Sequence, residues 1–75
     1  MTIWDLPKKT SGKVARFNLN MPENLKTRLN EMGFTVGQLV TCMKRTPFNG
    51  PLVIQVQDCV YSVDKQIASQ IEIQS

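Results

Sequence analysis

The chain has no histidine, only two cysteines and no long apolar run. Without histidine it lacks the side chain that most often acts as a general base, so nucleophilic catalysis would need an unusual one. Cys42 and Cys59 supply at most half of the four ligands that a structural zinc ion requires. These scarcities predict a binding module that is not an enzyme, with no catalytic residue, no metal ligand and no cofactor.

The same scarcities bear on the cellular location of the protein and on the number of its domains. No apolar stretch approaches the ~20 residues that a membrane-spanning helix needs. The start, Met1 to Asp5, has no basic stretch followed by an apolar segment, so we expect no secretory signal and a cytoplasmic location. Secreted domains this small usually need several disulfides, so we expect both cysteines to be reduced. The 75 residues hold no repeat or long linker, which predicts a single domain over residues 1–75.

Charge is mildly positive. Nine Lys and Arg against six Asp and Glu give a net charge of +3. The basic residues are scattered in pairs with acids between them, and no block reaches the five or six like charges typical of a nucleic-acid tail. The excess predicts attraction to an acidic partner, and it leaves a small nucleic-acid-binding barrel open as an alternative.

The clearest element is an α-helix predicted over residues 21–32. Leu25, Leu29 and Met32 recur at i, i+4 and i+7, which places them on one face of a helix. That spacing is more typical of a core than of a ligand set, so we interpret Met32 as a core residue.

Both ends of this helix carry recognisable signals. Asn20 is predicted to cap it, with Pro22 in the first turn and Glu23 at the capping-box position three residues after the cap. Gly33 is predicted to end it, because a left-handed residue costs least without a Cβ. Gly37 falls in the short turn that follows.

The rest of the chain predicts short strands. Leu52, Ile54 and Val56 alternate with Val53, Gln55 and Gln57, which is the period of a strand with one buried face. Asp64 is predicted to cap a helical turn over about residues 64–69. The first ten residues are predicted to form an irregular lead-in. The expected strands are about 12–17, 39–44, 52–56, 61–63 and 71–73. Together they predict a mainly β, partly closed barrel, either SH3-like or OB-like, because closure hides the sheet edges.

Phe48 is the aromatic residue of greatest interest for binding. It lies in a proline-rich turn, and the sequence leaves open whether it projects or folds back over the end of the barrel. Phe17 and Phe34 are expected in the core, which leaves few aromatics for a proline-motif groove or for base stacking.

A resemblance to a known family begins at the end of the helix. The run from Leu29 to Gly37 reads Leu-Asn-Glu-Met-Gly-Phe-Thr-Val-Gly. It resembles the signature of the ferrous iron transport protein A (FeoA) family, roughly Leu-x-x-Met-Gly-Leu/Phe-Thr-x-Gly. The matching positions Leu29, Met32, Gly33 and Gly37 form a structural motif in this reading.

The match spreads over nearly the whole chain, in order. It includes Trp4-Asp5-Leu6 in the lead-in, Gly12-Lys13-Val14 in the first strand, the turn over 46–51 and the closing segment over 64–73. At residues 48–50 the chain has Phe-Asn-Gly where the family more often has Leu-Gly-Asp.

Membership of that family implies an SH3-like barrel with an inserted helix. It implies a small cytosolic partner of the large ferrous iron transporter, a membrane protein with an N-terminal GTP-binding domain. Such a protein acts by contact and carries no iron itself. Similar domains occur at the C-terminus of iron-dependent repressors, so a stand-alone relative of that domain is a second alternative.

We therefore expect a patch that docks on the transporter. The candidate contacts are two basic pairs and one aromatic, namely Lys26, Arg28, Lys44, Arg45 and Phe48. A homodimer formed through an exposed strand edge is also open.

Overall fold

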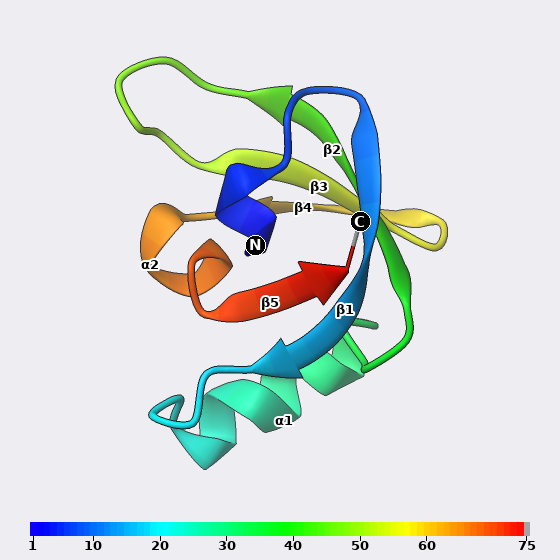
Figure 1. Ribbon diagram of the computed structural model, residues 1–75, viewed down its shortest axis with the longest axis vertical. Coiled ribbons are helices and arrows are strands. Elements are labelled where there is room, and N and C mark those ends of the chain that lie inside the picture. Colours follow the sequence, from blue (N-terminus) through cyan, green and yellow to red (C-terminus); the bar gives the residue numbers. More distant parts are fainter. Residues whose placement is uncertain (75) are drawn as a thin grey trace.

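The chain folds into one antiparallel sheet of five strands in the order β4-β3-β2-β1-β5. The computed structural model describes residues 1–74. Figure 1 shows the strands curving round the interior, with α1 at one end of the molecule between β1 and β2 in the chain. The elements are η1 (Ile3–Asp5), β1 (Thr10–Phe17), α1 (Glu23–Glu31), β2 (Leu39–Arg45), β3 (Leu52–Val56), β4 (Cys59–Val63), α2 (Lys65–Ala68) and β5 (Ile71–Gln74).

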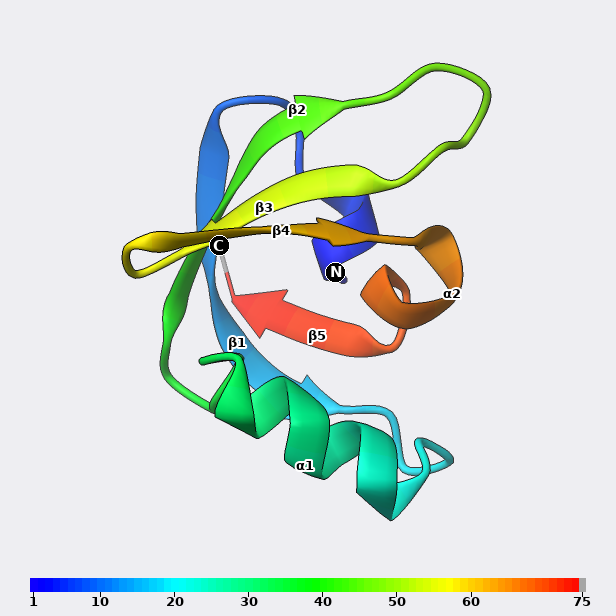
Figure 2. The same cartoon turned by 180° about the vertical axis from the view of Figure 1, so that it is seen from behind.

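Two register shifts bend the sheet into a partly closed barrel. One lies between Val14 and Arg16 where β1 pairs with β5, and the other between Cys42 and Lys44 where β2 pairs with β3. Such bulges bend a strand and increase its local twist. Beside β5, the short helices η1 and α2 contact each other on the open side of the barrel (Figure 2). The predicted mainly β, partly closed barrel with one inserted helix is confirmed.

The core lies inside this curved sheet. Leu52, Ile54 and Val56 are buried as their alternation predicted, and Phe34 is fully buried near Tyr61, with ring centroids 5.9 Å apart. Cys42 is a buried thiol, whereas Cys59 is an exposed one on β4. Within residues 1–74, no helix is long and apolar enough to cross a membrane. The other buried apolar residues are Ile3, Leu6, Val14, Met21, Leu29, Val40, Val63, Ala68, Ile71 and Ile73.

The lead-in is more ordered than predicted. It forms the 3₁₀-helix η1, and Ile3 is completely buried in the core. The Asp5 carboxylate accepts hydrogen bonds from the Thr2 backbone N–H at 2.9 Å and from the Thr2 hydroxyl at 3.1 Å. A three-residue element is too short to show a period in the sequence. Strand β1 also begins at Thr10, two residues earlier than predicted.

The start of α1 corrects one prediction. The helix runs from Glu23 to Glu31, and Pro22 occupies the cap position that we assigned to Asn20. Asn20 instead donates its backbone N–H to Asn18 Oδ1 at 2.9 Å, in a turn that the Met21 N–H closes on the Asn18 carbonyl. The turn keeps Asn20 two residues away from the first helical residues, so its side chain does not cap them.

The end of α1 follows the sequence signal. Gly33 has a φ of 103° and donates its N–H to the carbonyl of Asn30, while Phe34 donates to the carbonyl of Leu29 at 2.9 Å. These two bonds make a Schellman motif. Leu29 and Phe34, which the motif brings together, both belong to the buried core. Asp64 caps α2 as predicted, because its side chain accepts the Ile67 N–H at 3.0 Å.

Replacing Gly33 and Gly37 with alanine should separate the destabilisation caused by backbone strain from that caused by steric crowding. Both have positive φ, 103° and 90°, but a methyl at Gly33 would lie 3.0 Å from Val56 Cγ1, whereas no described atom lies within 4 Å at Gly37. We expect Gly37→Ala to lower the free energy of unfolding by about 1 kcal/mol through backbone strain, and Gly33→Ala to lower it further through crowding. Urea denaturation of both variants measures this. Equal losses would contradict crowding at Gly33.

Acid should weaken the lead-in through Asp5. The Thr2 backbone N–H, followed by the Thr2 hydroxyl, lowers the pKa of Asp5 below its ordinary value of 3.8. A lowered pKa means that the carboxylate stabilises the fold above 3.8, and that this stability is lost as the pH falls through the folded-state pKa. We expect Asp5→Asn to lower the melting temperature at neutral pH and to reduce its decline in acid. If the melting temperature of the variant fell with decreasing pH as much as that of the parent, this role of Asp5 would be contradicted.

Candidate docking surfaces

The five predicted contact residues do not form one surface. Lys26 and Arg28 lie on α1, whereas Lys44, Arg45 and Phe48 lie at the end of β2 and in the loop after it. Figures 1 and 2 place α1 and this loop at opposite ends of a molecule whose longest extent is 29 Å. The structure therefore separates the predicted patch into two surfaces.

Phe48 stands at the tip of the β2–β3 hairpin. Its side chain is 99% exposed, so it does not fold back over the barrel. Phe48 and Asn49 have φ values of 60° and 58°, and the Gly50 N–H donates to the Pro47 carbonyl at 3.2 Å. This is the geometry of a type I′ turn. A bulky residue with positive φ is rare in proteins.

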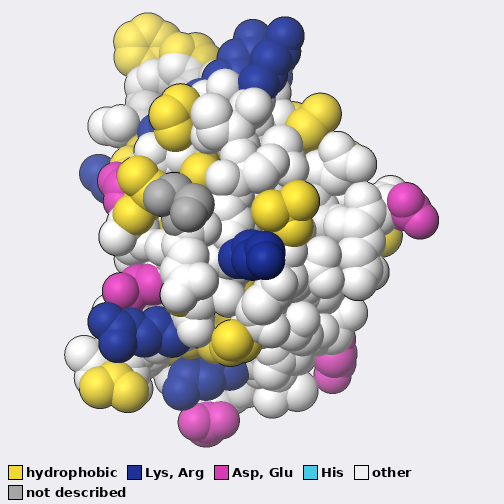
Figure 3. Space-filling view, turned by 45° about the vertical axis from the view of Figure 1, so that its right-hand side comes forward, with side chains coloured by type: hydrophobic (Ala, Val, Ile, Leu, Met, Phe, Trp, Pro, Cys, Tyr) yellow, Lys and Arg dark blue, Asp and Glu magenta, His cyan; other side chains and the backbone are white. Residues whose placement is uncertain are grey.

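Lysines from two segments lie near the base of this hairpin. Lys8 and Lys9 immediately precede Thr10, and Thr10 pairs with Cys42, two residues before Lys44. Figure 3 shows Lys and Arg side chains gathered with apolar ones at this end of the molecule. We call Lys8, Lys9, Lys44 and Phe48 the hairpin end. All four side chains are exposed, and the ion pairs of residues 1–74, Arg16–Glu72 and Lys26–Glu23, involve none of them.

Sequence reasoning missed two members of the hairpin end. Lys8 and Lys9 stand out in the sequence only as a basic pair in the lead-in. The register of β1 against β2 is what brings them beside Lys44, and that register is not readable from the pair itself.

Arg45 is engaged within the fold. Its Nη1 donates to the carbonyls of Trp4 and Leu6, both at 2.8 Å, and its guanidinium lies 5.0 Å from the centroid of the Trp4 ring. Lys65 approaches the same ring, with Nζ 5.6 Å from its centroid. Arg45 therefore fastens the lead-in to β2, and its donors are less available to a partner than those of Lys44.

Replacing Arg45 with alanine should loosen the lead-in. Hydrogen bonds from a charged donor contribute about 1.5–3 kcal/mol, and solvent exposure places Arg45 at the low end. We expect Arg45→Ala to lower the free energy of unfolding by about 1–2 kcal/mol and to shift the fluorescence of Trp4, the single tryptophan, towards the solvent-exposed value. The control is Lys44→Ala, with an expected loss within about 0.5 kcal/mol. If the two variants lost equal stability, Arg45 would have no fastening role.

A groove beside α1 forms the second surface. It has a volume of about 170 Å³ and lies between α1, β4 and α2. Arg28 is exposed at this groove, whereas Lys26 is half-buried and lies 3.5 Å from Glu23 Oε1. An apolar floor beside one cation can hold an apolar side chain next to an acid. We call it the α1 groove, and its lining residues are Leu25, Arg28, Leu29, Met32, Ser62, Val63 and Ile67.

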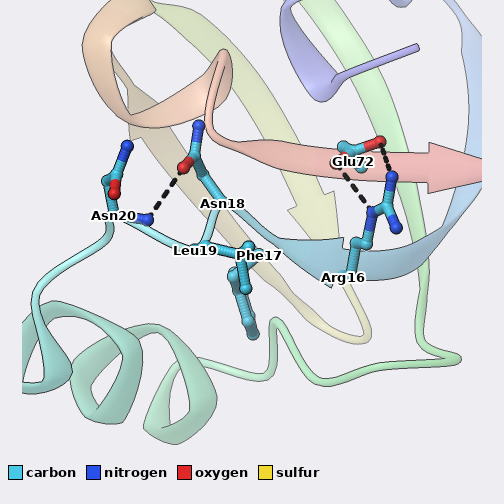
Figure 4. Close-up of a pocket in the computed structure, with 6 residues that line it drawn as sticks. All are labelled: Arg16, Phe17, Asn18, Leu19, Asn20 and Glu72. Carbon is cyan, nitrogen blue, oxygen red and sulfur yellow. Dashed lines mark hydrogen bonds and ion pairs between the residues drawn. The ribbon is translucent and has the colours of Figure 1, made fainter.

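A wider hollow at the end of β1 is lined by both polar and apolar side chains. It has a volume of about 400 Å³ and is drawn in Figure 4, where the side chains of Arg16 and Glu72 face each other. Arg16 Nε donates to Glu72 Oε2 at 2.8 Å, and Nη2 donates to Oε1 at 3.2 Å. The bonds from Arg16 lower the pKa of Glu72, as expected of a carboxylate held by a guanidinium. These charges are satisfied by each other, which leaves the hollow a weak candidate for a ligand.

The described residues offer surfaces for contact more than groups for chemistry. Within residues 1–74, no three His, Cys, Asp or Glu side chains gather where they could hold a metal ion. The features that remain are the hairpin end and the α1 groove.

The curled five-stranded sheet with a helix between its first two strands defines a small SH3-like barrel domain. A family model described as the FeoA domain matches residues 1–75. The chain therefore belongs to the FeoA domain family, a family associated with ferrous iron transport. The resemblance to the FeoA family and the SH3-like alternative are confirmed by this membership.

Solved structures of similar fold agree. Iron(II) transport protein A from Clostridium thermocellum superposes with a TM-score of 0.89 at 22% identity, over 99% of this chain and 44% of that one. The zinc complex of Stenotrophomonas maltophilia FeoA gives 0.84 at 28% identity, over 99% of this chain and 89% of that one. That protein is described as a unique procaryotic SH3 domain protein suggested to be an activating factor of bacterial ferrous iron transport.

The fold also occurs in regulators. A manganese-dependent transcriptional repressor superposes with a TM-score of 0.85 at 19% identity, over all of this chain and 41% of the repressor. At that identity the likeness shows a shared fold and does not favour a regulatory role. No curated protein sequence matches the chain significantly.

Proposed function

We propose that this protein is a cytoplasmic accessory factor of ferrous iron uptake that binds the ferrous iron transporter and catalyses no reaction itself. The observation that carries the proposal is the FeoA domain match over all 75 residues. The description of the 28% identical Stenotrophomonas protein as a suggested transport activating factor supports the same role. A role by contact also fits a surface on which the notable features are a groove and an exposed aromatic tip.

The α1 groove is the surface that we assign to the transporter. It is concave and mostly apolar, and Arg28 supplies one exposed positive charge at it. Interface energy concentrates where an anchoring side chain fills such a pocket, while a rim charge tunes the association rate and specificity. The expected occupant is a segment of the transporter's cytosolic region with an apolar side chain next to an acid. Lys26 contributes less, because Glu23 competes for its charge.

The nucleic-acid alternative draws support from the net charge of +3 alone. The exposed basic residues are spread over several elements rather than gathered in one stripe. Trp4 lies against Arg45 and Lys65, so the described residues offer no row of free aromatics for stacking. Binding to single strands that fell steeply with salt would favour this alternative over ours.

Calorimetric titration against the purified cytosolic domain of the same organism's transporter, with and without GTP, tests the proposal. We expect saturable binding, weakened about tenfold (~1.4 kcal/mol) by Arg28→Glu through lost charge complementarity. Ser62→Tyr should weaken it too, because Ser62 is an exposed residue lining the α1 groove and a larger ring would fill the space.

The matched control is Lys8→Glu, the same change of charge at the opposite end of the molecule. It should leave this binding unchanged. Absence of binding in both nucleotide states, or equal weakening by Arg28→Glu and Lys8→Glu, would refute the assignment of the α1 groove.

A further inference from the structure

The hairpin end combines an exposed aromatic side chain with positive charge, and its own two segments hold no acid. These segments, residues 6–10 and 43–51, contain Lys8, Lys9, Lys44 and Arg45 but no Asp or Glu. The nearest acid before them, Asp5, accepts hydrogen bonds from Thr2. Phe48 is 99% exposed at the tip, and Met43, one residue before Lys44, is 41% exposed. An apolar tip next to basic side chains is the composition of a surface that meets both hydrocarbon and anions.

The hairpin presents Phe48 in a defined position. The type I′ turn fixes the backbone on both sides of the ring, and the Thr46 hydroxyl donates to the Pro51 carbonyl at 2.8 Å across the base of the loop. Pro47 and Pro51 restrict the flanking backbone further. Because the loop is ordered in advance, little conformational freedom would be lost when Phe48 becomes buried.

The shape of the hairpin end favours a membrane over a protein pocket. The charges come from two separate segments beside a protruding tip, so a protein would need a cavity for Phe48 and a separate acid for each lysine. The surface of an anionic bilayer supplies phosphates on all sides and an apolar layer at headgroup depth, without any fixed register. Aromatic rings are enriched at that depth.

We propose that the hairpin end binds the surface of a bilayer containing anionic lipids, with Phe48 inserted at headgroup depth and Lys8, Lys9 and Lys44 against lipid phosphates. The α1 groove lies at the opposite end of the long axis, so the bound protein would hold that groove away from the bilayer and towards the aqueous phase (Figure 1). The orientation of the α1 groove is relevant only if the proposed function holds. Membrane binding by the hairpin end does not depend on the proposed function, because it needs no transporter.

Vesicle sedimentation with the full chain tests the proposal. The probes are phosphatidylcholine vesicles with and without phosphatidylglycerol. We expect binding to the anionic vesicles only, declining as salt is added because screening weakens the lysine contacts. Phe48→Ala should weaken binding about tenfold, and so should the double change Lys8→Glu with Lys44→Glu.

Matched controls come from the other end of the molecule. Leu19→Ala removes an apolar side chain that is 95% exposed, and Arg28→Glu makes the same charge change on α1. Both should bind anionic vesicles like the parent. Phe48 and the two lysines are exposed, so thermal melts should show all variants folded.

Three results would overturn the proposal. The first is no binding to anionic vesicles at low salt. The second is binding that Leu19→Ala weakens as much as Phe48→Ala does. The third is a Phe48→Ala variant that binds vesicles normally but loses affinity for the transporter's cytosolic domain, which would make the hairpin end a protein contact. The transporter titration is separate, so either proposal can fail without the other.

Discussion

The pairing of β1 with two neighbours is the constraint on which the rest of the structure depends. β1 bonds to β2 over its first half and to β5 over its second half, so it joins the middle of the chain to its end. At Gly12 a Cβ would lie 2.9 Å from Ile73 Cδ1 and 3.1 Å from the Gln74 carbonyl oxygen, so only glycine fits without displacement. This close approach lets β1 and β5 pack together, and the pairing of β1 with β2 brings Lys8 and Lys9 towards Lys44.

The barrel also keeps its two candidate surfaces apart. α1 and the β2–β3 hairpin lie at opposite ends of the long axis, with the sheet between them (Figure 2). Neither surface shares a residue with the other. Substitutions at one end should therefore act independently of the other end, since distant sites without shared partners have nearly additive effects. A domain this small can carry two contacts only if they are placed in this way.

The sequence predicted best what depends on local rules. The face of α1, the glycine exit at Gly33 and the alternation in β3 are each set by neighbours within a few residues, and all three are confirmed. The features that failed or were missed depend on distant contacts. Asn20 does not cap α1 because it lies in a turn with Asn18. Arg45 donates hydrogen bonds to two carbonyls about forty positions away in the chain. Those partners become visible only after the sheet has formed.

The turn at the hairpin tip shows how far local rules reach. Asn-Gly is the favoured central pair of a type I′ turn, which would centre the turn on Asn49 and Gly50. The structure centres it one residue earlier, on Phe48 and Asn49. Gly50 instead lies where a Cβ would collide with the Thr46 hydroxyl, which accounts for glycine at that position. Phe48 is thereby held with a φ of 60°, a conformation in which glycine or asparagine would cost less. Phe48 is therefore exposed and strained and adds nothing to the core, which agrees with the contact outside the molecule that we propose for it.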